Sequence, residues 1–227
     1  MKLVSKGLAA IAATMLFASA SAAVITTATA NNTGFAVSTT DLISSLVGTV
    51  SAGNLNSEEG LNSNTSGSAL TDGGFGKLTI DDGSPKSNPG MSIVHEGTTI
   101  TYTLGNLAGG YNIGRIDTFT GWRDSGRANQ NYTVSFAHAS DPSNFITAFS
   151  VSASDAGFND LMVSTTGTGG SALDFGVTAV RFNFSGVQNR FVGYREIDVV
   201  AVPEPTTLAL LGLGMLGFAV SRRKSAK

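Results

Sequence analysis

The chain contains no cysteine and only two histidines, His95 and His138. Without cysteine, neither a disulfide nor a thiolate metal site can stabilise the fold, so stability must come from packing, aided at most by a hard metal ion. The chain also has no G-x-S-x-G and no H-E-x-x-H motif, the local signatures of many hydrolases and zinc proteases. We therefore expect a protein that is not an enzyme. A carboxylate pair for glycoside hydrolysis is defined by its separation in space, so that single alternative stays open.

Basic side chains are scarce in the middle of the chain. Six of the 14 lysines and arginines lie in the terminal segments 1–23 and 202–227, whereas Glu204 is the only one of the 16 acids that does. The body, residues 24–201, therefore carries 8 basic and 15 acidic side chains. Because phosphate binding requires a basic surface, we expect no nucleic acid among the partners. The acidity leaves room for calcium.

Extended apolar runs occur only near the two ends. At the N-terminus, two lysines precede the apolar stretch Leu8–Ala18, which is followed by small residues. This three-part pattern is typical of a secretory signal peptide. We expect residues 1–23 to be removed near Ala22 or Ala23, with signal peptidase and the secretion machinery as partners. The mature domain then comprises residues 24–201.

The C-terminal run, residues 206–220, is followed by the basic residues Arg222, Arg223 and Lys224. As a helix it would be about 23 Å long, short of a hydrocarbon core of about 30 Å. Flanking apolar residues and snorkelling of the basic side chains can complete a transmembrane helix. The basic end should remain cytoplasmic, which places the body on the other side of the membrane.

The four residues before this run are Val202-Pro203-Glu204-Pro205. Proline lacks an amide hydrogen and resists helix, so the segment should be extended and accessible to a processing enzyme. Together, the proline-containing motif, the apolar run and the basic residues after it resemble the PEP-CTERM sorting tail of exported bacterial proteins. The resemblance implies that an exosortase-type enzyme recognises residues 202–227 and removes them, after transient anchoring in the inner membrane, on the way to the cell surface. An uncut single-span anchor is the alternative.

Between the two ends the hydrophobic period is two. Alternating apolar and polar residues predict strands over 99–104, 132–136 and 180–184. Further candidate strands are 77–81, 113–119, 145–152, 160–164 and 191–199. Residues 41–50 alone suggest a helical turn, capped by Asp41 or Thr40. Eight short antiparallel strands separated by Gly, Asn, Asp and Ser predict an all-β fold, a jelly-roll β-sandwich.

Three segments carry a second resemblance. They are Ala69-Leu70-Thr71-Asp72-Gly73, residues 121–134 beginning Gly-Trp-Arg-Asp-Ser-Gly-Arg, and Tyr194-Arg195-Glu196-Ile197-Asp198-Val199. In this order and spacing they resemble a discoidin-type, galactose-binding-like domain over residues 70–199. The resemblance implies an eight-stranded jelly roll that binds carbohydrate through loops at one end, often with a structural calcium ion at the side.

Asp72 and Glu196 match the calcium region of that family, so they are the candidate metal ligands. Calcium prefers carboxylate and carbonyl oxygens. The alternative is structural: Asp72 would form an Asx-turn, and Glu196 would pair with a basic side chain across the sheet. The sequence does not choose between the two.

Two aromatic side chains are candidates for stacking on a sugar. Trp122 is the only tryptophan, but it lies in a segment that resembles a framework strand, which favours packing in the core. Tyr111 lies in the loop Gly109-Gly110-Tyr111-Asn112 and is freer to contact a ligand.

The sequence therefore predicts an exported protein of the cell surface or extracellular matrix that binds carbohydrate or exopolysaccharide without catalysis. A structural matrix protein with no discrete ligand, associating through exposed strand edges, is one alternative. A polysaccharide hydrolase is another.

Overall fold

The structure is a computed structural model that describes residues 23–56, 65–76, 90–122 and 126–202. The expected signal peptide, the strand predicted at 77–81 and the C-terminal span 206–220 lie outside the described residues. The same holds for Pro203, Glu204 and Pro205 of the sorting motif. No helix in the described ranges is long and apolar enough to cross a membrane.

The described chain forms eleven strands and three short 3-10 turns, with no α-helix. The strands are β1 (Val24–Asn31), β2 (Thr49–Ala52), β3 (Leu55–Asn56), β4 (Ser92–His95), β5 (Thr99–Thr103), β6 (Tyr111–Gly121), β7 (Gln130–His138), β8 (Asp141–Ala153), β9 (Asp160–Gly167), β10 (Asp174–Phe184) and β11 (Phe191–Ala201). The turns are η1 (Ser68–Leu70), η2 (Thr168–Gly170) and η3 (Gln188–Arg190). Every strand pair is antiparallel.

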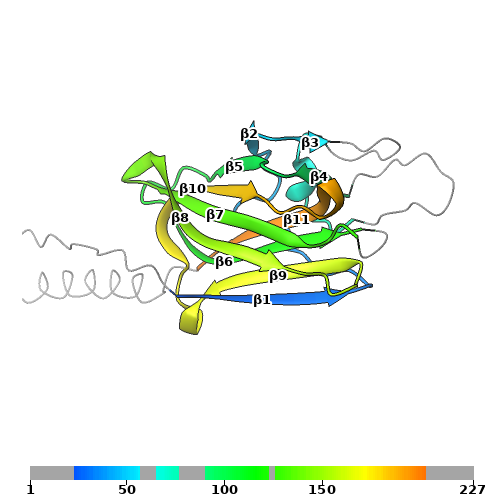
Figure 1. Ribbon diagram of the computed structural model, residues 1–227. Helices are drawn as coiled ribbons and strands as arrows, with labels where there is room; N and C mark the ends of the chain where they lie inside the picture. The colour runs from blue at the N-terminus through cyan, green and yellow to red at the C-terminus, as the bar shows by residue number, and fades with distance from the viewer. Residues whose placement is uncertain (1–22, 57–64, 77–89, 123–125, 203–227) are drawn as a thin grey trace, which may run out of the picture.

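The strands form two layers with the core between them (Figure 1). One layer has the order β8-β7-β10-β5-β2, and the other has the order β1-β9-β6-β11-β4-β3. The layers meet where the first residues of β10 pair with those of β6. The predicted all-β, antiparallel sandwich is confirmed, with eleven strands in the described residues instead of eight.

The apolar side chains of the alternating sequences at 132–136 and 180–184 lie between the two layers, as the pattern predicts. Tyr132, Val134 and Phe136 of β7 are buried, as are Val180 and Phe182 of β10. A buried polar bridge also joins the layers, because Gln130 of β7 donates hydrogen bonds to the carbonyl oxygens of Thr118 and Leu161 on the opposite sheet. These contacts fix the register of the two layers through directional bonds as well as packing.

The helical turn predicted for residues 41–50 is wrong in extent. The chain makes a single turn at residues 42–45, in which Asp41 Oδ1 accepts a hydrogen bond from the amide of Ile43 at 2.9 Å. β2 then begins at Thr49. Asp41 therefore caps the turn as expected. The turn does not continue as a helix to residue 50, because the chain is already extended in β2 from Thr49.

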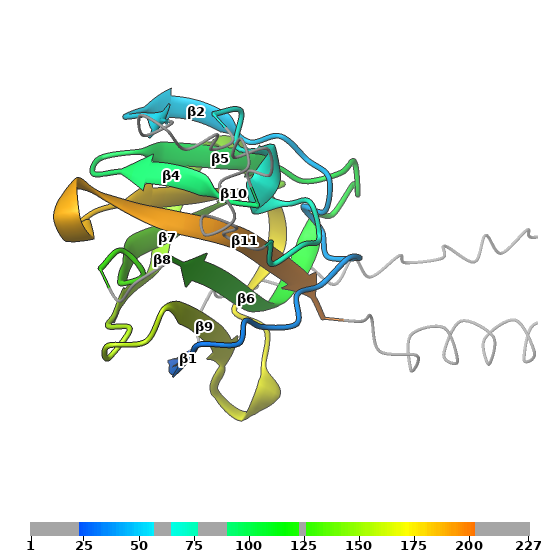
Figure 2. The same ribbon diagram turned by 90° about the vertical axis from the view of Figure 1, so that its right-hand side faces the viewer.

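The chain between β1 and β2 crosses the outer face of β6 and β11 (Figure 2). It is fastened there by hydrogen bonds from the Leu42 amide to the Val199 carbonyl and from the Val199 amide to Asp41 Oδ1. Phe35 and Phe75 pack against Phe119 on the same face. One face of this sheet is thus the core, and the other is covered in part by an extended segment.

Candidate functional site

The outer face of β11, β6 and β9 carries a row of polar side chains. Pairing places Asp198 directly opposite Asp117, and Asp117 directly opposite Ser164. Because side chains alternate along a strand, Ile197 and Ile116 point instead into the core. Asp117 and Asp198 are nevertheless almost fully buried, at 3% and 2% exposure, and residues 36–38 of the crossing segment line the same pocket as these two side chains.

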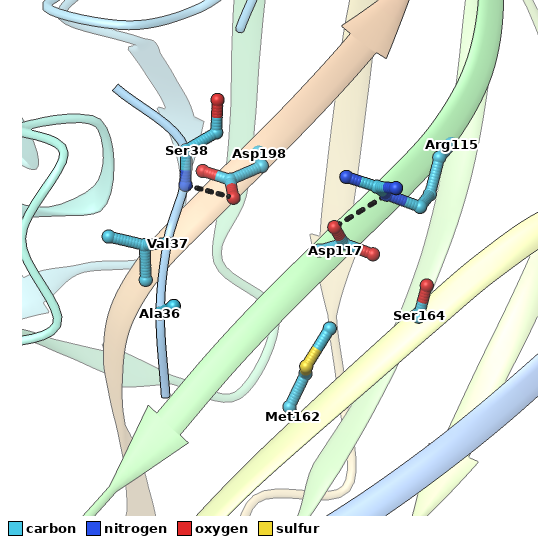
Figure 3. A pocket seen from close by; sticks show the side chains of 8 residues that line it. All are labelled: Ala36, Val37, Ser38, Arg115, Asp117, Met162, Ser164 and Asp198. Carbon is cyan, nitrogen blue, oxygen red and sulfur yellow. Dashed lines mark hydrogen bonds and ion pairs between the residues drawn. The ribbon is translucent and has the colours of Figure 1, made fainter. Parts of the chain in front are cut away.

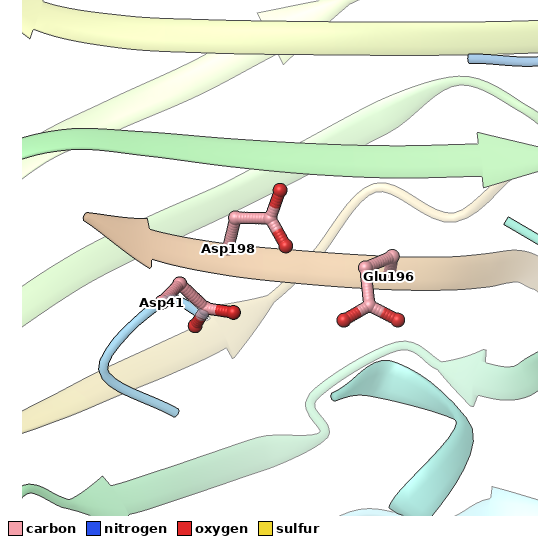
Figure 4. Close-up of side chains that lie close together, drawn as sticks. All are labelled: Asp41, Glu196 and Asp198. Atoms are coloured by element: carbon pink, nitrogen blue, oxygen red, sulfur yellow. The ribbon is translucent and has the colours of Figure 1, made fainter. Parts of the chain in front are cut away.

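Three carboxylates converge at one end of this row. Asp41, Glu196 and Asp198 each place an oxygen within 4.8 Å of the others. Figure 4 shows Glu196 and Asp198 on β11, with Asp41 approaching from the crossing segment. Residues two apart in a strand share a face, which explains why Glu196 and Asp198 meet there. We call Asp41, Glu196 and Asp198 the acidic trio.

Burial changes the acidity of the trio. Desolvation, together with the neighbouring carboxylates of Asp198, Asp72 and Asp41, raises the pKa of Glu196 to about 9, although a hydrogen bond from the Gly73 amide opposes the shift. Desolvation likewise raises the pKa of Asp198 to about 7 and raises the pKa of Asp41. The site therefore holds negative charge at a free-energy cost unless protons or a cation compensate it.

The trio also has unused hydrogen-bonding capacity. Asp41 Oδ2, Glu196 Oε2 and Asp198 Oδ1 are buried without a hydrogen-bond partner among the described residues. Three carboxylates with unsatisfied oxygens form a donor set suited to a hard divalent cation such as calcium. The residues present fit such an ion, which would neutralise the repulsion within the trio.

Of the two predicted metal ligands, Glu196 belongs to the trio and Asp72 does not. The Asp72-Gly73 turn lies beside β11, where the Gly73 amide donates to Glu196 Oε1 at 3.3 Å. Asp72 itself forms an Asx-turn, its Oδ1 accepting from the Gly74 amide at 2.8 Å, and it lies outside the trio. Sequence reasoning missed Asp198 and Asp41. The spacing of Asp198 from Glu196 could have indicated the first, but no local signal connects Asp41 to β11.

A pocket of about 330 Å³ opens beside the trio. Its lining consists of Ala36, Val37, Ser38, Arg115, Asp117, Met162, Ser164 and Asp198. Figure 3 shows residues 36–38 on one side and the side chains of β6 and β9 on the other. Asp198 Oδ2 accepts a hydrogen bond from the Ser38 amide at 2.8 Å, so Asp198 belongs both to the pocket and to the trio.

Arg115 and Asp117 form an ion pair at the pocket, with 2.8 Å between Nε and Oδ2. The Arg115 side chain is 47% exposed and the Asp117 side chain 4%, so the pair reaches from the solvent into the buried row. Asp117 Oδ1 is buried and has no partner among the described residues. The pocket thus presents a fixed donor group, fixed acceptors and the apolar side chains of Val37 and Met162.

The two aromatic candidates lie elsewhere. Trp122 is 2% exposed and packs against Phe191 with 5.3 Å between ring centroids, while the Arg127 guanidinium lies 5.0 Å from its ring. A ring enclosed in this way has no free face for a sugar. Tyr111 is half-buried at the start of β6, opposite Val177, and does not contribute to the pocket.

Comparison with known proteins gives one sequence match and a set of structural ones. Residues 201–224 match the PEP-CTERM protein-sorting motif. The chain has no significant match among curated proteins.

Family 32 carbohydrate-binding modules are among the structural neighbours of this chain. One is the CBM32-5 module of Clostridium perfringens CpGH89 in complex with GalNAc-β-1,3-galactose (15% identity, TM-score 0.44, covering 68% of this chain and 94% of the module). Another is the family 32 module of C. perfringens NanJ in complex with galactose (11% identity, TM-score 0.44, covering 67% of this chain and 92% of the module). Likeness at this level transfers no ligand.

Proposed function

We propose that this protein is delivered to the cell surface or extracellular matrix and there binds carbohydrate without catalysis, through the pocket beside the acidic trio. The sorting motif indicates export. The observation that supports a ligand is the pocket itself, where the Arg115–Asp117 pair and Asp198 border apolar side chains. A sugar presents hydroxyl groups at its edges and C–H groups on its faces, so it matches fixed polar groups set beside an apolar wall.

The sorting motif supports a particular presentation of this domain. The start of β1 and the end of β11 lie at the same end of the sandwich (Figure 1). The motif begins at residue 201, within the last residues of β11, and the Val202 amide donates to the Asn112 carbonyl at that end. An exosortase-type enzyme would therefore act beside this end, after signal peptidase and the secretion machinery have delivered the chain.

A calcium ion at the acidic trio would serve this function structurally. Asp41 and Asp198 both hold the crossing segment, through the Val199 amide and the Ser38 amide respectively. An ion shared by them would fix residues 38–41 against β11 and so fix one wall of the pocket. Asp72, which lies beside the trio, remains a proposed contributor through its turn.

The alternative with a specific observation behind it is a matrix protein that associates with itself. Among the residues that the structure describes, β1 pairs only with β9 and β8 pairs only with β7, so both are edge strands there. The first six residues of β1 are exposed. Edges of this kind can pair with another chain.

An array of bacterial and plant glycans, probed with the purified body (residues 24–201) with and without calcium, tests the proposal. Selective retention that falls in Met162→Ala, which removes part of the apolar wall, supports binding at the pocket. Sedimentation of the same sample tests self-association, and release of reducing ends from the retained glycan tests hydrolysis by Asp117 and Asp198. Absence of retention under every condition would contradict carbohydrate binding and favour the matrix alternative.

A further inference from the structure

The pocket that we propose for carbohydrate is acidic, and one of its two carboxylates, Asp198, also belongs to the trio. Arg115 is the only basic side chain of its lining, against the carboxylates of Asp117 and Asp198. Behind Asp198 lie Asp41 and Glu196. A divalent cation in the trio would compensate two of these four negative charges and Arg115 a third. One negative charge therefore remains even with a cation bound at the trio.

The position of the two aspartates makes this charge unfavourable for the empty site. Asp117 and Asp198 are direct partners across neighbouring strands, an arrangement in which like charges repel. Both are buried, so water screens the repulsion poorly. Arg115 offsets the charge of Asp117 through one oxygen, but the Arg115 side chain is half exposed and the Asp117 side chain is not.

Hydrogen bonding leads to the same conclusion. Asp117 Oδ1 and Asp198 Oδ1 are buried acceptors with no partner among the described residues. A buried acceptor without a donor carries a desolvation penalty that a ligand can remove. A hydroxyl group would bring one donor and no charge. A protonated primary amine brings three donors, no acceptor and one positive charge. It would therefore both donate hydrogen bonds to the unpaired carboxylate oxygens and compensate their negative charge.

We propose that the pocket selects a protonated amino sugar, with the ammonium group at Asp117 and Asp198 and the ring against Val37 and Met162. The volume of about 330 Å³ lies at the lower end of the range for ligand sites, about 300–1,000 Å³, and suits one sugar ring. The partner is then a polysaccharide with free amino groups rather than a neutral or N-acetylated one. This inference rests on the proposed carbohydrate-binding function and names its substrate class.

Titration calorimetry of the full-length chain tests the inference, in a polyoxyethylene detergent that contains no sugar. The ligands are glucosamine tetramer, its fully N-acetylated counterpart, cellotetraose and spermidine. We expect the glucosamine tetramer to bind at least about tenfold more tightly than the acetylated and neutral tetramers, because both lack the charge. Spermidine, which has amines but no ring, should bind more weakly than the glucosamine tetramer.

Two substitutions localise the effect. Asp117→Asn keeps the size of the side chain, removes the charge and should abolish the preference for the free amine, while Asp141→Asn on exposed β8 should leave it unchanged. Arg115→Gln removes the competing cation from an exposed position and should strengthen glucosamine binding, so the test does not depend on the folding of the Asp117 variant.

The outcomes separate the two proposals. Equal or tighter binding of the neutral or acetylated tetramers would overturn the amine selectivity and leave carbohydrate binding standing. If spermidine binds as tightly as the glucosamine tetramer, the pocket binds amines without recognising the sugar ring, and the proposed selection of an amino sugar is wrong. If none of the tetramers binds, the carbohydrate function at this pocket fails as well.

Discussion

The acidic trio makes a quantitative prediction about pH and calcium. In the folded protein without a cation, the pKa of Glu196 is about 9, against 4.5 as the ordinary value for the unfolded chain. The folded state therefore holds a proton that the unfolded state releases above about pH 4.5, so stability falls as pH rises through this window toward 9. From pH 5 to 7 the loss from Glu196 is about 3 kcal/mol at most. Asp198, with a pKa raised from 3.8 to about 7, acts in the same direction.

For a domain of this size, that loss lowers the melting temperature by roughly 5–10 °C between pH 5 and 7. The fluorescence of the single buried tryptophan, Trp122, or circular dichroism can follow the melt in chelator. Calcium in excess should flatten the pH dependence, because a bound ion stabilises the ionised trio. At 100 times its dissociation constant, calcium should add about 2.7 kcal/mol near pH 7.

Glu196→Gln should remove most of the pH dependence and the response to calcium, whereas Glu96→Gln at an exposed turn should keep both. A melting temperature in chelator that stays constant or rises between pH 5 and 7 would refute the conclusion that burial raises the pKa values of Glu196 and Asp198. A pH dependence that calcium leaves unchanged would refute the cation site alone.

Four further expectations can be checked independently. Gln130→Ala removes the bridge to Thr118 and Leu161 and should lower the free energy of unfolding by about 2–4 kcal/mol in urea titrations. Gly121→Ala would force a methyl group onto Arg195 and Asp160 and should lower the melting temperature, whereas Gly109→Ala enters open space and should not. Glu204→Ala should leave the sorting tail attached, seen as a full-length band in the membrane fraction of the producing cell. Tyr111→Ala tests the stacking role that remains proposed for this residue, which lies outside the pocket: a fall in retention on an exopolysaccharide column with an unchanged melting curve would support it, whereas binding at the pocket alone predicts unchanged retention.

The strands with the cleanest alternation in the sequence are those with one buried and one solvated face, whereas β11, predicted at 191–199, is buried on both faces there. β7 alternates Tyr132, Val134 and Phe136 with polar residues because only one side packs on the core. β4 is buried on both faces except at His95, so it has no alternation to detect. β1 is exposed along most of its length and lacks an apolar face. Hydrophobic period therefore finds half-buried strands and gives no signal for strands such as β4 and β1.

The candidate site required information that local pattern does not contain. Asp117 faces Asp198 because of the pairing register of β6 and β11, and a shift of one residue would send each to the opposite face. Asp41 reaches the same place only because the segment after β1 crosses the sheet. The resemblance in the final strand drew attention to Glu196, but its partners come from long-range topology.

The crossing segment ties the cation site to the pocket through Asp198. Its Oδ2 holds the Ser38 amide at one wall of the pocket, while the same carboxylate belongs to the trio that includes Asp41. Only two residues separate Ser38 from Asp41, and the Leu42 amide is bonded to the Val199 carbonyl. Repulsion among the carboxylates of an ion-free trio would act directly on residues 38–41 and hence on the wall of the pocket that Ser38 forms. Calcium therefore favours one position of the crossing segment, but it would share the Asp198 carboxylate with the proposed ammonium group, so by linkage calcium and an amino sugar should each lower the affinity for the other.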